Sequence, residues 1–293
     1  MDLRMSAKIK RALKNIRKHK NPLRFILSRI LPYIGISKIL TIPREGYILK
    51  FHDSSMSKSL FADPKQNRSG LEVLNRLIEP GDIVLDIGAN IGDYTISFSK
   101  KVGKNGCVYA FEPHPRTIKY LRENIILNRT QNVATAQVAV GSNFDWVTIT
   151  DLRSDTINHI SGQGGSIIVP SIKLDSFFYN TPISFLKVDT EGAEKLVFDG
   201  AFDLLSSVRC IVFEAKDSHY ERFNFCFKDV FDLLHKHRFE VLKYKNGLAQ
   251  YVHRESTFPL AQNLFACRDP HAFARALDAR LVETPNDTNT HRE

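Results

Sequence analysis

The chain has 293 residues, of which 43% are apolar and 25% are charged, as in an ordinary globular protein with one large domain and extensions. The formal net charge of +9 is confined to one end. Residues 1–40 contain eleven Lys or Arg and one acid, whereas the rest of the chain contains 30 basic and 31 acidic side chains. The folded body is therefore close to neutral, and the basic charge belongs to an N-terminal arm.

The composition excludes several other classes of protein. No window contains the roughly 18–20 uncharged apolar residues of a membrane-spanning helix. The first twenty residues are too charged for a secretory signal. The four cysteines stand singly, which favours a reducing compartment. We expect a cytoplasmic protein.

The arm places apolar residues at helical spacing over residues 6–18, with Lys and Arg at the other positions. A basic amphipathic helix of this kind can lie on an anionic membrane, contact nucleic acid, or remain a solvated arm. No aromatic side chain interleaves the charges before Phe25, which argues against nucleic acid. Peripheral contact with an anionic membrane through residues 1–40 is therefore an expectation, and a nucleic-acid partner is not expected.

Beyond the arm, strand-like and helical patterns alternate. Strands are expected over residues 46–51, 83–87, 107–111, 133–140, 146–150, 166–172, 183–188, 208–213, 239–244 and 263–267. Helices are expected over residues 70–78, 94–102, 115–128, 193–198, 225–237 and 272–281. This alternation predicts an α/β fold with an open, mostly parallel sheet and helices on both faces.

Three regions follow from these patterns. Residues 1–59 are the basic arm and a lead-in strand, residues 60–270 form the catalytic domain, and residues 271–293 are a tail that we expect to be partly disordered. A Gly/Ser-rich segment, residues 161–165, is either a mobile lid or a long hairpin connection.

The centre of the pattern is the strand and turn over residues 83–93. Asp86 lies in the strand end, and Gly88 and Gly92 permit a sharp turn into a helix. The next strand ends at Glu112. Both loops would open at the carboxyl ends of adjacent parallel strands, where such sheets bind ligands. A nucleotide-type site is therefore expected here.

The spacing of the glycines and the nearby acid indicate which ligand binds. Gly88 and Gly92 do not make the G-x-G-x-x-G pattern of dinucleotide sites, and an acid at Asp86 suits a cation better than a phosphate. S-adenosylmethionine carries a sulfonium and an ammonium group and no phosphate. We expect Asp86 to balance those charges directly or through water, and Gly88 and Ala89 to pass close to the methionine part. Glu112 would accept hydrogen bonds from the ribose hydroxyls.

Further residues are candidates for the same site. Pro113 would shape the turn beneath the ribose, and Ala139 lies where the adenine is expected. Asn90 and Tyr94 are expected neighbours of the cofactor, although a polar loop residue and an aromatic residue on a helix face would also explain them. Ordinary strand core would likewise explain Ala139.

Three sequence blocks resemble the FkbM-type family of S-adenosylmethionine-dependent methyltransferases. They are Val84–Gly92, Phe111–Pro113, and Leu186–Glu194 with Gly200 following. The resemblance covers roughly residues 60–245. It implies a Rossmann-like class I methyltransferase fold, with a seven-stranded sheet and a reversed last strand. It also implies O-methylation, usually of sugars or natural products.

Methyl transfer to oxygen requires alignment of the acceptor and removal of the hydroxyl proton. Asp189 is the first candidate because it ends a strand next to the cofactor strand; Glu191 and His219 are the others. Helix capping would also explain Asp189, and a first-turn acid would explain Glu191. Asp189, Glu191 and Glu214 can instead share a divalent cation, although no spacing requires a metal. Lys187, inside a buried strand, needs a partner that the sequence does not identify.

Together with this resemblance, the residues predict a methyltransferase, and the resemblance implies a hydroxyl of a sugar, glycan or glycolipid-like acceptor. An RNA methyltransferase and a catalytically inactive scaffold of the same fold remain as alternatives. A nicotinamide-dependent dehydrogenase is disfavoured by the missing middle glycine and by Asp86. The acceptor, the position methylated, the general base and the oligomeric state do not follow from the sequence.

Overall fold

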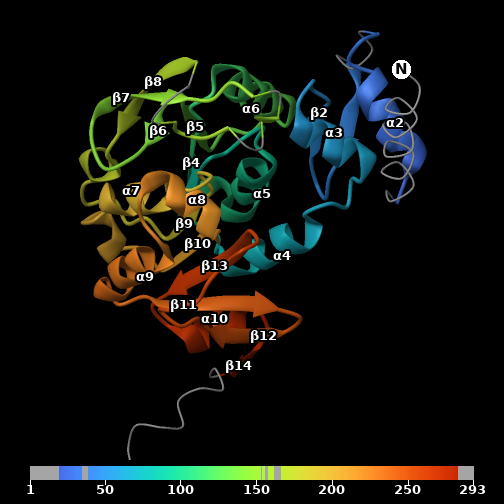
Figure 1. Cartoon of the computed structure of the whole chain (residues 1–293). Coiled ribbons are helices and arrows are strands. Elements are labelled where there is room, and N and C mark those ends of the chain that lie inside the picture. The colour runs from blue at the N-terminus through green and yellow to red at the C-terminus, as the bar shows by residue number, and fades with distance from the viewer. Residues whose placement is uncertain (1–19, 35–38, 153, 156–157, 162–165, 283–293) are drawn as a thin grey trace, which may run out of the picture.

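The computed structural model describes residues 20–34, 39–152, 154–155, 158–161 and 166–282 (Figure 1). The helix expected over residues 6–18 and most of the Gly/Ser-rich segment therefore lie outside the described residues. In the described part of the chain, no helix has the length and apolar character needed to cross a bilayer.

A nine-stranded sheet forms the middle layer (Figure 1). In spatial order its strands are β14 (Arg280–Val282), β12 (Leu248–Tyr251), β11 (Glu240–Lys245), β13 (Gln262–Cys267), β10 (Cys210–Ala215), β9 (Phe185–Val188), β3 (Ile83–Ile87), β4 (Cys107–Phe111) and β5 (Val133–Ala136). The strands from β10 to β5 are all parallel, and β13 is antiparallel to both of its neighbours, β10 and β11. The mostly parallel sheet with a reversed last strand is thus confirmed, and β12 and β14 extend its seven strands to nine.

The register of the central strands brings three loops to one edge of the sheet. Ile87 of β3 pairs with Phe111 of β4 and with Val188 of β9. The residues that follow these strands are Gly88, Glu112 and Asp189. The three loops that begin with these residues therefore lie side by side at one edge of the sheet, at the carboxyl ends of parallel strands.

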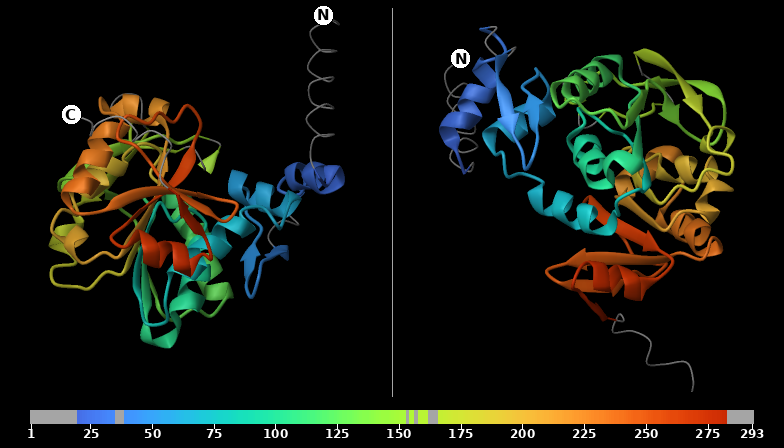
Figure 2. Two further views of the ribbon diagram at one scale, coloured as in Figure 1. Left: turned by 90° about the horizontal axis from the view of Figure 1, so that it is seen from below. Right: turned by 180° about the vertical axis from the view of Figure 1, so that it is seen from behind.

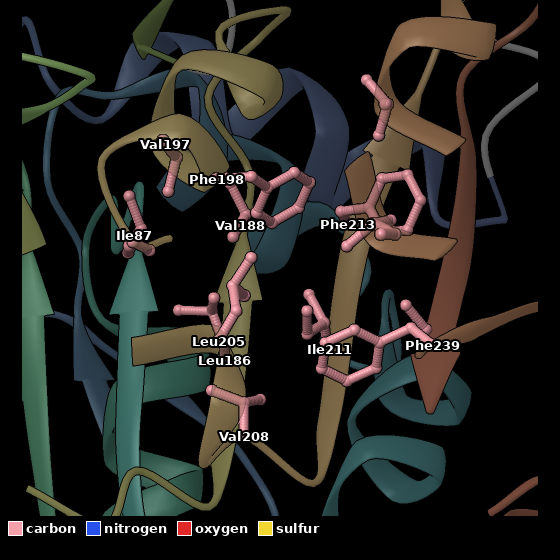
Figure 3. Packing of buried hydrophobic residues seen from close by; sticks show 14 of the residues in the cluster. Ile87, Leu186, Val188, Val197, Phe198, Leu205, Val208, Ile211, Phe213 and Phe239 are labelled. Carbon is pink, nitrogen blue, oxygen red and sulfur yellow. The ribbon is translucent and has the colours of Figure 1, made fainter. Parts of the chain in front are cut away.

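Helices cover both faces of the sheet. On one face lie α4 (Arg68–Leu77), α5 (Asp93–Val102), α6 (Pro115–Leu127) and α10 (Pro270–Ala276). On the other lie α7 (Glu194–Asp199) and α9 (Phe227–Lys236), with the short helix α8 (Asp217–Tyr220) after β10. Figure 3 shows the core beneath α7, where side chains of β3, β9 and β10 meet Val197 and Phe198. Because alternate strand residues face opposite layers, the continuous apolar runs of β3, β9 and β10 supply both cores.

The third predicted strand, residues 133–140, was expected to be continuous, and this is wrong. Only Val133–Ala136 joins the main sheet, as its edge strand β5. Beyond it the chain leaves the edge, and β6 (Ala139–Val140) pairs with β8 (Ile167–Ile172), which also pairs with β7 (Asp145–Ile149). This small sheet covers the same face as α7, because Val140 and Ile172 enter that core.

The lead-in segment packs on the catalytic domain. It contains α2 (Pro22–Ile30), the hairpin β1 (Thr41–Pro43) and β2 (Ile48–Lys50), and α3 (Ser55–Ala62). Arg44 forms a buried, two-pronged ion pair with Asp93 at the start of α5, and the Tyr47 hydroxyl donates to the same carboxylate at 2.7 Å. The segment therefore has a fixed place beside α5 and α6.

The C-terminal region carries regular structure as far as Val282. Phe273 of α10 is buried against the sheet, and β14 pairs with β12. Residues 271–282 thus form part of the sheet and its covering layer (Figure 2).

Candidate active site

A cavity of about 280 Å³ lies at the carboxyl ends of β3, β4 and β9. Its walls come from the loops after these strands, from the segment around β6, from Glu214 at the end of β10, and from Met56 of α3. Distant parts of the chain thus meet around one hollow, as expected for a ligand site of an open α/β sheet.

Glu112 is buried at the wall formed by β4. Its carboxylate accepts the backbone N–H groups of Asn90, at 2.9 Å, and of His114, at 3.0 Å. Burial raises the pKa of Glu112 to about 7, although these two hydrogen bonds favour the ionised form. The carboxylate is thus fixed in place, with lone pairs left to accept ribose hydroxyls.

Gly88 and Ala89, which were predicted to lie close to the methionine part of the cofactor, line the cavity. Gly88 has a φ of +76°, and a Cβ built on it would lie 1.9 Å from the carbonyl oxygen of Asp189. Glycine is therefore required where the turn after β3 passes the end of β9. Gly92, with a φ of +91°, does not line the cavity; a Cβ there would meet the Leu121 side chain of α6 at 2.5 Å. Its role is to let α5 begin close to α6.

Asp86 lies behind the cavity wall and does not line it. Its buried carboxylate accepts the Thr95 hydroxyl at 2.6 Å and lies 3.2 Å from the Lys187 ammonium. Lys187 also lies 3.4 Å from Asp189, and its ammonium sits 5.1 Å from the centre of the Tyr94 ring. Asp86 is therefore the partner of Lys187, which the sequence did not identify, and its charge does not face a ligand directly.

The other predicted cofactor residues surround the cavity. Asn90, Tyr94, Pro113 and Ala139 all line it. Asn90 has a φ of +50°, which an asparagine tolerates well, and this conformation aims its N–H at Glu112. Burial raises the pKa of Tyr94 to about 12 and keeps its hydroxyl neutral. Ala139 belongs to β6, beside an apolar cluster with Ile149 that suits a flat base.

Three carboxylates form one end of the cavity. Asp189 and Glu191 follow β9, and Glu214 lies near the carboxyl end of strand β10. All three line the cavity. Burial, and then repulsion by Asp189, raise the pKa of Glu191 to about 8 and that of Glu214 to about 7. This end can therefore hold or accept a proton near neutral pH.

His219 lies next to these carboxylates but not in the cavity lining. Its Nδ1 is 3.4 Å from Glu191 and 3.6 Å from Glu214, and its Nε2 is 2.9 Å from the Lys216 ammonium. An ammonium has no lone pair, so Nε2 accepts and Nδ1 carries the proton of the neutral ring. Burial, together with Arg222 and Lys216, lowers the pKa of His219 to about 4. The ring is thus placed to hold the two glutamates.

Ligand atoms of Glu191, Glu214 and His219 all lie within 4.8 Å of one another. Two carboxylates and an imidazole at this spacing can hold a divalent cation, although surface acids often lie as close without one. The metal set considered from the sequence had Asp189 in place of His219.

Asp155 is a residue of the site that was not foreseen from the sequence. Asp155 lines the cavity and accepts the backbone N–H groups of Ser55 and Met56 at the start of α3. Its own carbonyl accepts the Asn90 side-chain amide at 3.4 Å. The site is thereby linked to the lead-in helices, a contact between segments about a hundred residues apart that local patterns do not reveal.

A family model described as "Methyltransferase FkbM domain" matches residues 86–241, more than half of the 293 residues. The chain belongs to the FkbM methyltransferase family. The match runs from β3 into β11 and includes every wall of the cavity except Met56. The cavity of this FkbM-family chain thus lies in the part that matches the methyltransferase domain.

Two curated relatives of this FkbM-family chain match over short stretches. A tRNA (guanine(37)-N(1))-methyltransferase of Phytophthora infestans is 36% identical over 69 residues, which are 24% of this chain and 16% of that protein. The tRNA (guanine(37)-N(1))-methyltransferase Trm5b of Pyrococcus abyssi is 38% identical over 58 residues, 20% of this chain and 17% of that protein. The chain thus spans less than a fifth of the length of these relatives.

Among solved structures, a SAM-dependent methyltransferase from Aquifex aeolicus aligns with a TM-score of 0.43 at 16% identity. The alignment covers 75% of this chain and all of that one. A SAM-dependent O-methyltransferase from Thermotoga maritima aligns with a TM-score of 0.40 at 14% identity, over 69% of this chain and 65% of that one.

The residues of the cavity fit S-adenosylmethionine. Glu112 offers a fixed carboxylate for the ribose, Ala139 and Ile149 offer an apolar surface for the adenine, and Gly88 and Ala89 leave room for the methionine part. The acidic end, with Asp189 and Glu191, suits a cationic group. The carboxylate that faces the cavity is that of Asp189, whereas Asp86 was expected there from the sequence.

Proposed function

We propose that the protein transfers a methyl group from S-adenosylmethionine to a hydroxyl of a sugar, glycan or glycolipid-like acceptor. The observation that carries this proposal is the pair of half-buried carboxylates, Glu191 and Glu214, in the cavity wall. Among the described residues, His219 is the one basic side chain within ion-pair distance of either carboxylate. The pair is therefore available to accept a proton.

A hydroxyl acceptor needs such a group because its oxygen becomes a good nucleophile only as the proton leaves. A positioned base is most effective when its pKa lies near the working pH. The pKa values of Glu214 and Glu191, about 7 and about 8, meet this condition. S-adenosylmethionine, when bound, supplies an electrophilic methyl group on its sulfonium.

In this proposal the chain's own residues divide the work. Glu214, with Glu191, takes the hydroxyl proton, and His219 holds the two carboxylates in place. The ammonium of Lys187 lies 3.4 Å from the Asp189 carboxylate and holds it at the cavity wall, where a cationic group of the ligand is to be bound. Polar groups of Asn158 and Thr190 in the lining offer hydrogen bonds to a hydroxyl-rich acceptor.

RNA is the second candidate acceptor, because both curated relatives are tRNA methyltransferases. The near-neutral charge outside residues 1–40 argues against it, since phosphate contacts need Lys and Arg. The three carboxylates at the end of the cavity would also repel a phosphate backbone.

The test is an acceptor screen with methyl-labelled S-adenosylmethionine. Nucleotide sugars, glycolipid extracts and a tRNA transcript are offered separately to the wild type and to Glu214→Gln. We expect label in a base-stable methyl ether of a sugar, and a loss of turnover of about a hundredfold or more in the variant. Label in the tRNA base alone would contradict the proposal. A chelator added to parallel reactions shows whether a cation takes part.

A further inference from the structure

The helix α2 presents an apolar face to solvent. Leu23, Ile26, Leu27 and Ile30 are exposed to 70%, 36%, 37% and 48%. Their spacing of three and four residues places them on one side of the helix. Ile34 follows one turn later and is also exposed. Single exposed apolar residues are ordinary, but five on one stripe form a continuous surface.

The opposite face of α2 is the one that packs against α3. There Ser28 is fully buried, and its hydroxyl donates to the Phe25 carbonyl at 2.7 Å. The Arg24 guanidinium lies 5.0 Å from the centre of the Phe61 ring of α3. The helix thus buries Ser28 and half-buries Arg24, while its leucines and isoleucines face outward. An ordinary surface helix shows the reverse pattern, with its apolar side chains on the core and its polar side chains in water.

Basic side chains flank the apolar stripe. Lys20 precedes α2 with its side chain 84% exposed, and Arg29 lies on the helix itself, with its guanidinium over the Phe25 ring. Residues 1–40 together hold eleven Lys or Arg and one acid. Apolar residues between long basic side chains are the pattern of a helix that lies in the headgroup layer of an anionic bilayer.

The position of α2 in the molecule allows such contact. All three views place it at the outer rim, with α3 between it and the catalytic domain (Figures 1 and 2). Its nine residues span only about 14 Å, less than half of a hydrocarbon core of about 30 Å, so it can lie on a membrane but not cross it. Met56 of α3 lines the methyltransferase cavity, so one helix separates this surface from the site.

We propose that the Leu23–Ile34 face of α2 docks the protein on a membrane surface that contains anionic lipids. The apolar side chains enter the boundary between headgroups and acyl chains, and Lys20 and Arg29 contact lipid phosphates. The proposal does not depend on the acceptor, because its evidence is the exposed face of α2 and its charge.

Flotation with lipid vesicles tests this proposal. The full chain is mixed with phosphatidylcholine vesicles, with and without about one third phosphatidylglycerol. The test variant is Leu23→Gln/Ile30→Gln, since glutamine preserves helix propensity and neither side chain is buried. The control variant is Ile126→Gln/Leu260→Gln, which removes one isoleucine and one leucine that are 75% and 78% exposed elsewhere.

We expect the wild type and the control variant to float with anionic vesicles, with binding that weakens as salt is added. The test variant should partition at least about tenfold more weakly. All three proteins should bind S-adenosylmethionine equally, which shows that the fold is intact. Absence of wild-type binding, or equal binding by the test and control variants, would overturn the proposal. A third result would also overturn it: the wild type forms an oligomer and does not bind vesicles, and the test variant is a monomer while the control variant is not. The face of α2 would then join protein chains.

Discussion

Gly88 shows how a single position serves both the fold and the site. Its φ of +76° equals that of Gly46, but a Cβ at Gly46 would meet nothing within 4 Å, whereas one at Gly88 would lie against Asp189. Gly46→Ala should therefore lower the free energy of unfolding by about 1 kcal/mol, the cost of the backbone conformation alone. Gly88→Ala should cost clearly more and should also weaken S-adenosylmethionine binding. Chemical denaturation and calorimetry measure both effects, and equal losses in the two variants would contradict the close approach.

The acidic end of the cavity predicts the pH dependence of turnover. The proton acceptor must be ionised, and the pKa values of Glu214 and Glu191 are raised to about 7 and about 8. The rate should therefore rise as the pH increases through this range. His219→Asn should lower the rate but keep the same rising limb, because the pKa of His219, about 4, lies below that range. A limb that vanishes in His219→Asn and persists in Glu214→Gln would make His219 the base.

At this scale the sequence located the residues whose positions depend on the backbone nearby, while their roles stay predictions. Gly88, Ala89, Asn90 and Glu112 lie in two turns whose geometry follows from short motifs, and all four line the cavity. His219 was named as a candidate base but lies behind the glutamates. Its position depends on the path of the chain after β10, which no local pattern determines.

At the scale of elements, the pairing of β3 with β9 determines where buried charge can lie. Asp86 and Lys187 are direct register partners in these two strands, and this is why the lysine is tolerated. The sequence did not identify this pair, because the alignment of the two strands by their ends follows only once they are known to be neighbours. A buried charge that loses its partner is far more costly than a surface charge.

Lys187→Met should therefore lower the free energy of unfolding by about 3–5 kcal/mol, because Asp86 would be left charged and buried. In Lys187→Met/Asp86→Asn the charge is removed, and the amide can still accept the Thr95 hydroxyl. Urea denaturation should show that the double variant recovers a large part of the loss. If the double variant were the less stable of the two, the two side chains would not be partners.

At the scale of the whole molecule, the alternation of strands and helices was enough to predict the sheet and its covering layers. The short strands β12 and β14 were missed, because three or four residues at the sheet edge carry little apolar pattern. The single long strand over residues 133–140 was predicted because apolar residues continue through it, yet its second half pairs in another sheet. Which sheet a segment joins depends on the strands that lie beside it in space, and these are distant in the sequence.

The contacts that link the lead-in segment to the cavity also join parts of the chain that are distant in sequence. Asp155 joins α3 to the loop after β3, and Arg44 joins the lead-in hairpin to α5. A boundary near residue 60 follows from the sequence pattern, whereas these contacts tie residues on both sides of it together. The surface of α2 and the methyltransferase site are therefore carried by one packed body.

The most direct test of the account is calorimetric titration of S-adenosylmethionine into the wild type and Glu112→Gln. The variant keeps the size of the side chain but replaces one carboxylate oxygen with a hydrogen-bond donor. Loss of hydrogen bonds to a charged group should weaken binding by roughly 1.5–3 kcal/mol, or about tenfold to a hundredfold. Equal affinity for both proteins would contradict the assignment of Glu112 to the ribose, and no binding to the folded wild type would contradict the assignment of this cavity to the methyl donor.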